Sequence, residues 1–122
     1  MTRLTGFQQK GWGHEMIFVS NDKYCGKKLV FRKGGKFSMH FHREKVETWI
    51  VLSGKFQLEI INTKNACKKV ILLEKESVWT NEALVPHQLT CIEEGTILEI
   101  STPDSVEDNY RVIPGDSQAI EV

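Results

Sequence analysis

Two histidines and a glutamate are spaced so that their side chains could meet at one metal ion. His40 and His42 lie two apart in an alternating segment, residues 37–42. Residues two apart on a β-strand point to the same face, so both imidazoles project together, with Phe37 on the opposite face. A polar turn follows, and Glu47 begins the next apolar segment, from which its carboxylate can return to the histidines. The spacing predicts a metal site.

A third imidazole, His87, stands in a distant alternating segment and shares a face with Leu89 and Cys91. Three imidazoles and a carboxylate suit one divalent ion of Zn, Fe, Mn, Ni or Co, and the sequence does not choose among them. A vacant coordination position would let a substrate oxygen bind and be polarised. Alternatively, such histidines are exposed or hydrogen-bonded without a metal. Three of the chain's four histidines fall in this pattern, which favours the metal.

Composition narrows the class of protein. The 122 residues predict a single domain, residues 1–122, with a core at about 11–102 and a polar tail at 103–122, an arm or a frayed end. Sixteen basic and sixteen acidic residues leave a net charge of zero, without the basic block that nucleic acid or an anionic membrane would require. The expected partner is a small molecule.

No apolar run resembles a signal peptide or membrane span, so we expect a cytoplasmic protein. Three cysteines without Cys-x-x-Cys spacing predict reduced thiols, with Cys91 buried.

Strand signals recur at short intervals, and no segment between them is typical of a helix. The pattern predicts an all-β sandwich or barrel whose core contains Phe41, Ile50, Leu58 and Ile100. Turn residues separate the segments, among them Ser53-Gly54 and residues 93–95. The expected strands are residues 15–19, 28–32, 37–42, 47–52, 55–61, 69–73, 77–80, 86–92 and 96–101.

The first block resembles the first signature of the cupin superfamily. Gly34, His40, His42, Glu47 and Gly54 match that signature at every position. The second signature is matched only at His87; its other positions hold Glu76, Glu82, Leu84 and Cys91. The resemblance implies a double-stranded β-helix, or jelly-roll barrel.

Within the cupins, the chain is similar to the mannose-6-phosphate isomerase-like group, over about residues 11–115. The similarity is carried by residues 11–15, 47–54, 98–100 and 108–111. That group's terminal Asp-x-Tyr-Gly-Arg is absent, and Pro114-Gly115-Asp116 stands there instead.

This resemblance implies an isomerase or epimerase of a sugar or sugar phosphate, with one divalent metal ion held by His40, His42, Glu47 and His87. Such an ion would acidify the proton next to a carbonyl group and stabilise an enediolate. Glu99 is the candidate catalytic base, and an exposed strand glutamate is the alternative.

Arg111 is the candidate substrate-binding residue, through its planar donors to a phosphate. A surface ion pair is the alternative. Trp12 is expected to cap the barrel rather than floor a sugar site, and His14 to be a surface or packing residue rather than a further ligand.

Two other functions stay open. A cupin that binds a metal or small ligand without turnover would explain the degenerate second signature. An Fe-dependent dioxygenase could use the same three histidines and glutamate. We also expect a homodimer, because small sheets leave edges and faces that need cover.

Overall fold

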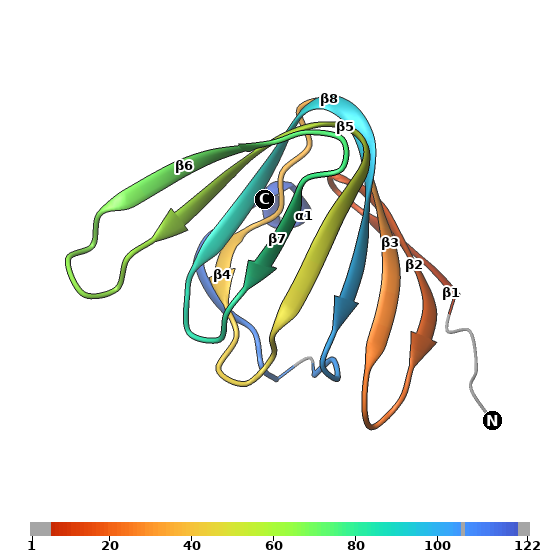
Figure 1. Cartoon of the computed structure of the whole chain (residues 1–122), viewed down its shortest axis with the longest axis horizontal. Helices are drawn as coiled ribbons and strands as arrows, with labels where there is room; N and C mark the ends of the chain where they lie inside the picture. The colour runs from red at the N-terminus through yellow and green to blue at the C-terminus, as the bar shows by residue number, and fades with distance from the viewer. Residues whose placement is uncertain (1–5, 106, 120–122) are drawn as a thin grey trace.

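The computed structural model describes residues 6–105 and 107–119. These residues form an antiparallel β-structure, which confirms the prediction of an all-β fold (Figure 1). A four-residue helix, which the sequence did not predict, follows the last strand. In chain order the elements are β1 (Gly6–Lys10), β2 (Gly13–Ser20), β3 (Cys25–Phe31), β4 (Met39–Phe41), β5 (Glu47–Ile61), β6 (Lys68–Leu73), β7 (Val78–Asn81), β8 (His87–Ser101), β9 (Tyr110–Ile113) and α1 (Asp116–Ala119).

Strands β5 and β8 form the spine of the fold. Each is 15 residues long, and they pair along most of their length, with register shifts between Val51 and Phe56. Residues 53–54 and 93–95 were predicted to be turns, but they bend continuous strands. Glycine is required there, because Gly54 has a φ of 85° and a Cβ on Gly95 would collide with the Ser53 carbonyl oxygen.

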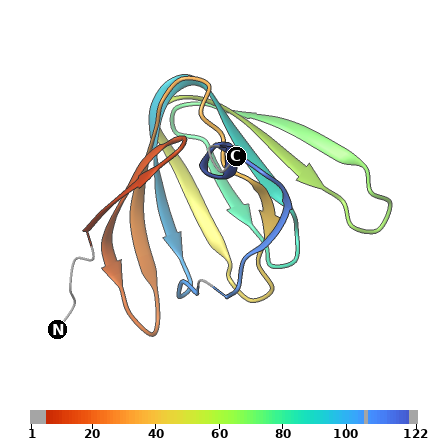
Figure 2. The ribbon, with the colours of Figure 1, turned by 180° about the vertical axis from the view of Figure 1, so that it is seen from behind.

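The bend divides the sheet into two leaves that diverge from it (Figures 1 and 2). The N-terminal half of β5 and the C-terminal half of β8 form one leaf with β1, β2, β3 and β7. The remaining halves form the other leaf with β4, β6 and β9. The inner faces of the two leaves enclose the core and, beyond it, a cavity.

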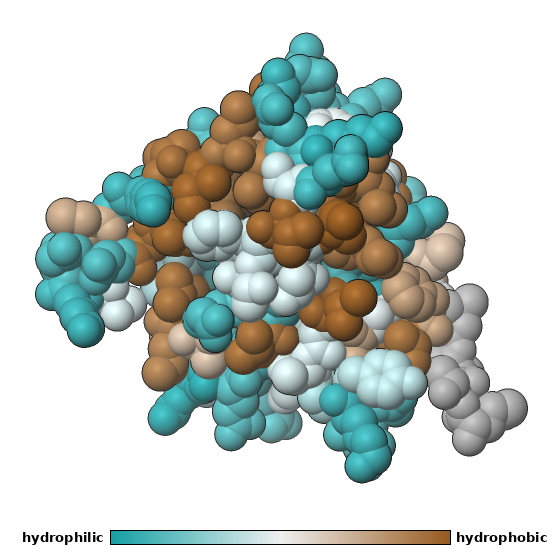
Figure 3. Space-filling model, viewed as in Figure 1, coloured by the Kyte–Doolittle hydropathy of each residue, from teal (hydrophilic) through white to brown (hydrophobic). Residues whose placement is uncertain are grey.

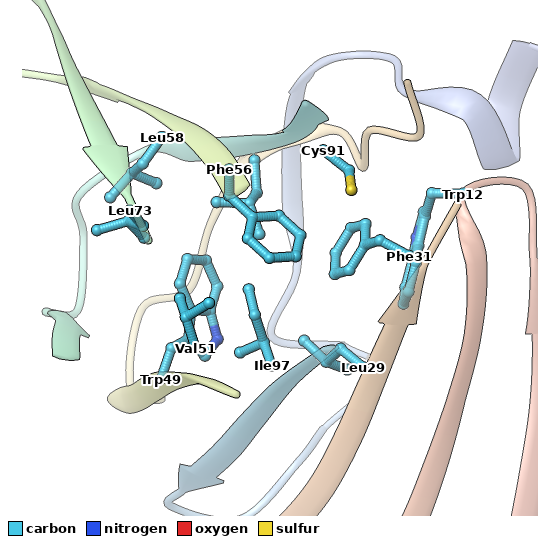
Figure 4. Packing of buried hydrophobic residues seen from close by; sticks show 11 residues of the cluster. Trp12, Leu29, Phe31, Trp49, Val51, Phe56, Leu58, Leu73, Cys91 and Ile97 are labelled. Carbon is cyan, nitrogen blue, oxygen red and sulfur yellow. The ribbon is translucent and has the colours of Figure 1, made fainter. Parts of the chain in front are cut away.

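The hydrophobic core gathers aromatic side chains near the bend (Figure 4). Trp12 stacks on Phe31 with ring centroids 4.3 Å apart, and Phe31 meets the edge of Phe56 at 5.2 Å. Trp12 is buried among core residues and also lines the cavity, so its position does not separate a cap from the floor of a site. Cys91 is also buried in the core, as predicted.

Of the four residues predicted to lie in the core, one is exposed and two are only half-buried. Leu58 is fully buried, but Phe41 and Ile50 are half-buried and Ile100 is 60% exposed. The cause lies in β8, where Ile97, Glu99 and Ser101 are buried, so that Ile100 points outward. The polar side chain of Glu99 takes the inward-facing position, so Ile100 does not reach the core where it was expected.

The C-terminal segment is part of the fold rather than a frayed arm. Strand β9 pairs with β4, and the two lie side by side in Figure 2. Beyond it, the Asp116 carboxylate pairs with Arg32 at 2.9 Å and accepts a hydrogen bond from the Lys36 amide at 3.0 Å. Strand β1, also unpredicted, extends the opposite leaf. No helix among the described residues is both long and apolar enough to cross a membrane.

Candidate metal centre

Three histidines converge between the two leaves. His40 of β4 and His87 of β8 are direct partners in the strand register, and His42 follows one residue after β4. Their ligand-capable atoms all lie within 4.8 Å of one another. The fourth histidine, His14, instead stacks on Phe7 with ring centroids 4.6 Å apart. The packing role expected for His14 agrees with this contact.

Each of the three imidazoles is oriented by a backbone carbonyl. Nδ1 of His40 donates to Ser38 at 2.7 Å, Nδ1 of His42 to Asp108 at 2.6 Å, and Nδ1 of His87 to Val85 at 3.0 Å. A proton on Nδ1 leaves the Nε2 lone pair free in a neutral ring. Metal-binding histidines typically use this arrangement.

The Glu47 carboxylate lies outside this group of three and approaches it at His87. It is buried, and its Oε1 lies 3.1 Å from Nε2 of His87. With the His87 proton on Nδ1, an imidazole lone pair faces a carboxylate oxygen, and a shared cation would turn this contact into an attractive one. The three imidazoles therefore fit a divalent metal ion, and Glu47, beside His87, is the candidate fourth ligand.

A hydrogen-bonded chain holds Glu47 in place. Asn81 Nδ2 donates to Glu47 Oε1 at 3.3 Å, and Asn81 Oδ1 accepts from Trp79 Nε1 at 2.9 Å. Both partners belong to β7, in the leaf that faces His40 and His87. Glu47 thus reaches the histidines across the cavity.

The protonation states suit metal binding. Burial, reinforced by the neighbouring His87, lowers the pKa of His40 to about 3 and keeps this ring neutral. Burial acts to raise the pKa of Glu47, but a His87 ring that carries a proton on Nε2 as well, and then Lys45, outweigh it and hold that pKa below its ordinary value. Glu47 is consequently ionised at neutral pH.

Two buried lysines lie beside the cluster among acidic side chains. Lys45 Nζ lies 3.2 Å from Glu99, 3.6 Å from Glu47 and in direct contact with Asp104. Lys27 Nζ lies 2.8 Å from Asp104. Burial alone would lower the pKa of Lys45, but Glu99, Glu47 and Asp104 raise it above its ordinary value.

Glu99 lies inside the cavity, not on the surface. It is only 4% exposed, and its Oε1 accepts a hydrogen bond from Trp49 Nε1 at 3.1 Å. Burial, followed by the nearby charge of Glu47, raises the pKa of Glu99, although Lys45 and Lys27 oppose this shift. The alternative of an exposed strand glutamate is therefore wrong.

The comparisons with known proteins agree with this architecture. The family described as mannose-6-phosphate isomerase C-terminal matches residues 5–108. The chain belongs to this family. Its similarity to mannose-1-phosphate guanylyltransferases reaches 30% identity over 71% of the chain for the Salmonella muenchen protein, and 23% over 81% for the Escherichia coli protein. The chain spans only about a fifth of these relatives, 19% and 22% of their lengths.

Solved structures show the same fold at low sequence identity. The capsular polysaccharide assembling protein CapF from Staphylococcus aureus superposes with a TM-score of 0.79 at 15% identity, over 93% of this chain and 32% of that one. Oxalate decarboxylase from Bacillus subtilis superposes with a TM-score of 0.76 at 14% identity, over 92% of this chain and 32% of that one. Both are cupins, and the predicted cupin jelly roll is confirmed.

The cavity of this family member has a volume of about 650 Å³ and brings the remaining candidates together. Glu99 and Arg111 both line it, with His40, His42 and Glu47. Arg111, on β9, is the register partner of His40. The segment that the family matches ends at residue 108, before Arg111.

Phe37 does not lie on the face predicted for it. Inside the cavity, its ring centroid lies 5.1 Å from that of His40 and 5.9 Å from that of Trp49. The reason is that β4 begins only at Met39, so the strict alternation of a strand does not extend back to residue 37.

Sequence reasoning missed four functional neighbours. Lys27 and Glu15 occupy inward positions of apolar strands. Each is separated by an even number of residues from buried apolar residues of its strand, and this spacing could have identified both. Lys45 was assigned to a polar turn. Asp104 lies in the supposed tail, where no local pattern marked it.

Proposed function

We propose that this chain is a metal-dependent cupin that isomerises or epimerises a sugar or sugar phosphate, with one divalent ion held by His40, His42, Glu47 and His87. The proposal is carried by the contact of His87 Nε2 with Glu47 Oε1 at 3.1 Å, since a neutral His87 that is protonated at Nδ1 presents a lone pair to the carboxylate. Support also comes from the three Nδ1 hydrogen bonds and from family membership. The identity of the metal stays open among Zn, Fe, Mn, Ni and Co.

A divalent ion at this position would polarise oxygen atoms of an open-chain sugar. The chain itself must then move a proton between neighbouring carbons, and we assign that role to Glu99. A carboxylate with a raised pKa lies closer to the working pH of a general base than an exposed one. Lys45, 3.2 Å from Glu99 Oε2, favours the ionised form that accepts the proton.

Arg111 is our candidate for the phosphate of the substrate. Its position opposite His40 in the strand register places both side chains on one face of the sheet. The planar guanidinium offers paired donors to a phosphate group.

The experiment has two parts. Metal content is measured on the protein as purified, and uptake of solvent deuterium at C2 is followed for mannose-6-phosphate and other aldose phosphates. We expect uptake that a chelator abolishes, and that Glu99→Gln reduces at least a hundredfold while metal binding persists. If the fully metallated protein catalyses no uptake of deuterium at C2, the proposed isomerase activity is wrong.

One observation favours a binding cupin without turnover as the second candidate. Glu99 is already engaged by Trp49 at one oxygen and Lys45 at the other, as a purely structural carboxylate would be. A metallated protein that binds sugars without exchange would support this candidate. Oxygen consumption by the iron-loaded protein with a substrate would instead support a dioxygenase.

We also propose a homodimer formed through the outer face of the leaf that contains β7. Exposed apolar side chains gather there (Figure 3), including Phe18, Leu52, Val78 and Ile100. Threonines Thr48 and Thr80 lie between them in the strand register. Contiguous apolar surface of this kind marks interaction sites. An apolar, threonine-rich face is complementary to itself, as a two-fold interface requires.

A further inference from the structure

The barrel has an open seam between the two end strands of its sheet. The strand order runs β1-β2-β3-β8-β4-β9, and among the residues that the structure describes β1 and β9 do not pair with each other. Side chains on both sides of this seam line the cavity, with Gln8 and Lys10 on β1 and Arg111 on β9. The cavity therefore extends to the seam.

The C-terminal segment crosses this seam. Ser117 Oγ in α1 accepts a hydrogen bond at 3.1 Å from the amide of Gly11, in the turn between β1 and β2. A Cβ on Gly11 would lie 2.5 Å from the carbonyl carbon of Asp116, so the two backbones are in close contact. Figure 2 shows α1 beside this turn and β9 beside β4. Residues 109–117, which we call the strap, therefore connect the two leaves across the mouth of the cavity.

The strap lies over the candidate metal centre. Arg111 of the strap is the register partner of His40, and Asn109 also lines the cavity. Gly115 lies against Phe37, where a Cβ would come within 2.3 Å of the carbonyl carbon. The Phe37 ring centroid in turn lies 5.1 Å from that of His40. Movement of the strap would therefore change access to the imidazoles.

The strap is fixed firmly before its first residue and weakly at its last. Before the strap, Asp104 pairs with two buried lysines. At the far end the Asp116 carboxylate meets Arg32 Nη2 at 2.9 Å and the Lys36 amide at 3.0 Å. The Arg32 side chain is 57% exposed, and ion pairs this exposed contribute little. Between the two ends, β9 pairs with β4 at three positions only, and all of its residues are exposed.

We propose that the strap is a gate, which peels from the Asp116 end toward Asp108 to admit and release the metal ion and small ligand of the candidate metal centre. Segments with few buried contacts open at low free energy, and lids are drawn from them. Neither Arg32 nor Asp116 is a candidate metal ligand, so the gate can open without loss of a ligand. The gate controls access to the site of the proposed function and rests on that function for what passes through it.

Hydrogen exchange followed by mass spectrometry tests whether the strap opens. The variants Arg32→Gln and Asp116→Asn should each exchange about fivefold faster in residues 109–117, because the anchor at the far end is lost. Exchange in β5 should stay unchanged. Lys68→Gln is the matched control, since it removes an ion pair of similar exposure, to Glu59 at 3.4 Å, in which no strap residue takes part.

Two probes test whether opening controls access. The first is Zn²⁺, whose uptake and transfer to a chelator are timed on the full chain. A gate alters how often the site is open, not how strongly the open site binds, so both rates should rise about fivefold in each variant while Kd stays constant. The second is diethyl pyrocarbonate, applied to the metal-free protein. Modification of His40 and His42 should accelerate by a similar factor relative to His14, which lies outside the cluster.

Unchanged exchange in residues 109–117 of both variants, equal acceleration in β5, or equal acceleration in Lys68→Gln would overturn the opening of the strap. Faster exchange with unchanged Zn²⁺ rates and unchanged histidine modification would overturn the gate, as would a change in Kd that accounts for the faster release. Failure of the proposed function gives a different result. A wild type that binds no Zn²⁺, with His40 and His42 modified faster in both variants, would remove the metal centre and retain the gate.

Discussion

Nδ1 of His42 donates a hydrogen bond to the backbone carbonyl oxygen of Asp108 at 2.6 Å, although 66 residues separate them in the chain. The Asp108 carboxylate also accepts hydrogen bonds from the amides of Arg43, Glu44 and Lys45, at 2.6, 3.1 and 3.1 Å. One residue therefore holds both the imidazole and the turn that leads to Glu47. Asp108 is a positioning residue for the candidate metal ligands.

Replacing Asp108 with alanine should weaken metal binding about tenfold, the lower end of the effect of losing a group that orients ligands. The carbonyl remains in the variant, but the turn between His42 and Glu47 loses three hydrogen bonds. Metal titration of Asp108→Ala and Asp108→Asn measures this, and asparagine, which keeps an acceptor, should recover part of the affinity. Glu107→Ala, at an exposed neighbour, is the control. Equal affinity of Asp108→Ala and wild type would contradict the positioning role.

Lys45→Met should destabilise the protein by about 3–5 kcal/mol, because removing one partner leaves buried charges uncompensated. The carboxylates that would lose this partner are those of Glu47, Glu99 and Asp104. Chemical denaturation measures the free energy of unfolding. Lys64→Met, at an exposed lysine, should change it by less than about 0.5 kcal/mol. A loss no larger than the control's would show that the charge cluster does not stabilise the fold.

The stability contributed by Asp104 should disappear in acid. Burial acts to raise its pKa, but Lys27 and Lys45 lower it from 3.8 to about 2. The Cys25 thiol lies 3.5 Å from the carboxylate, and Lys45 also pairs with Glu99. A pKa depressed by folding stabilises the folded state above the ordinary pKa, and this contribution is lost as the pH falls through the lower value. The contribution of Asp104 is therefore complete above about pH 4 and gone near pH 2.

The comparison of wild type with Asp104→Asn tests this. The difference in unfolding free energy should be constant from pH 7 to 5 and should shrink between pH 4 and 2. Asp22→Asn, in the exposed β2–β3 turn, is the control and should show no such trend. A difference that persists unchanged at pH 2 would rule out the ion pairs as its source.

Self-association through the outer face should depend on Ile100. Light scattering is expected to give twice the mass of the chain for the wild type and the mass of one chain for Ile100→Lys, because a charge at a self-complementary apolar face repels its own copy. Val70→Lys, on the exposed β6 of the other leaf, should remain dimeric. A monomeric wild type would refute the dimer.

The candidate ligands could be identified from sequence because their signal is local. His40 and His42 share a strand face, and Glu47 follows at a short fixed spacing, so geometry over eight residues suffices. His87 could be proposed from its own alternating segment, but its pairing with His40 could not, since it joins segments 47 residues apart.

The rest of the site and of the fold depends on contacts between residues far apart in the sequence, which no local sequence pattern indicates. Asp104 and Asp108 meet the site from a polar segment that resembled a frayed end. Ile100 is exposed where a core position was expected, because its neighbour Glu99 takes the buried position, where Trp49 and Lys45 pair with it. The long bent strands looked like separate strands, since Gly54 and Gly95 mark turns and bends alike.

The most direct test of the metal centre is the metal stoichiometry of wild type, His40→Ala and His42→Ala, with circular dichroism to monitor folding. We predict one divalent ion per wild-type chain and less than about a tenth of that in each variant, with the β-structure retained because the core lies at the bend and does not include these histidines. His14→Ala, outside the cluster, should bind like the wild type. Stoichiometric metal in both His40→Ala and His42→Ala, or none in the wild type after reconstitution, would contradict the site.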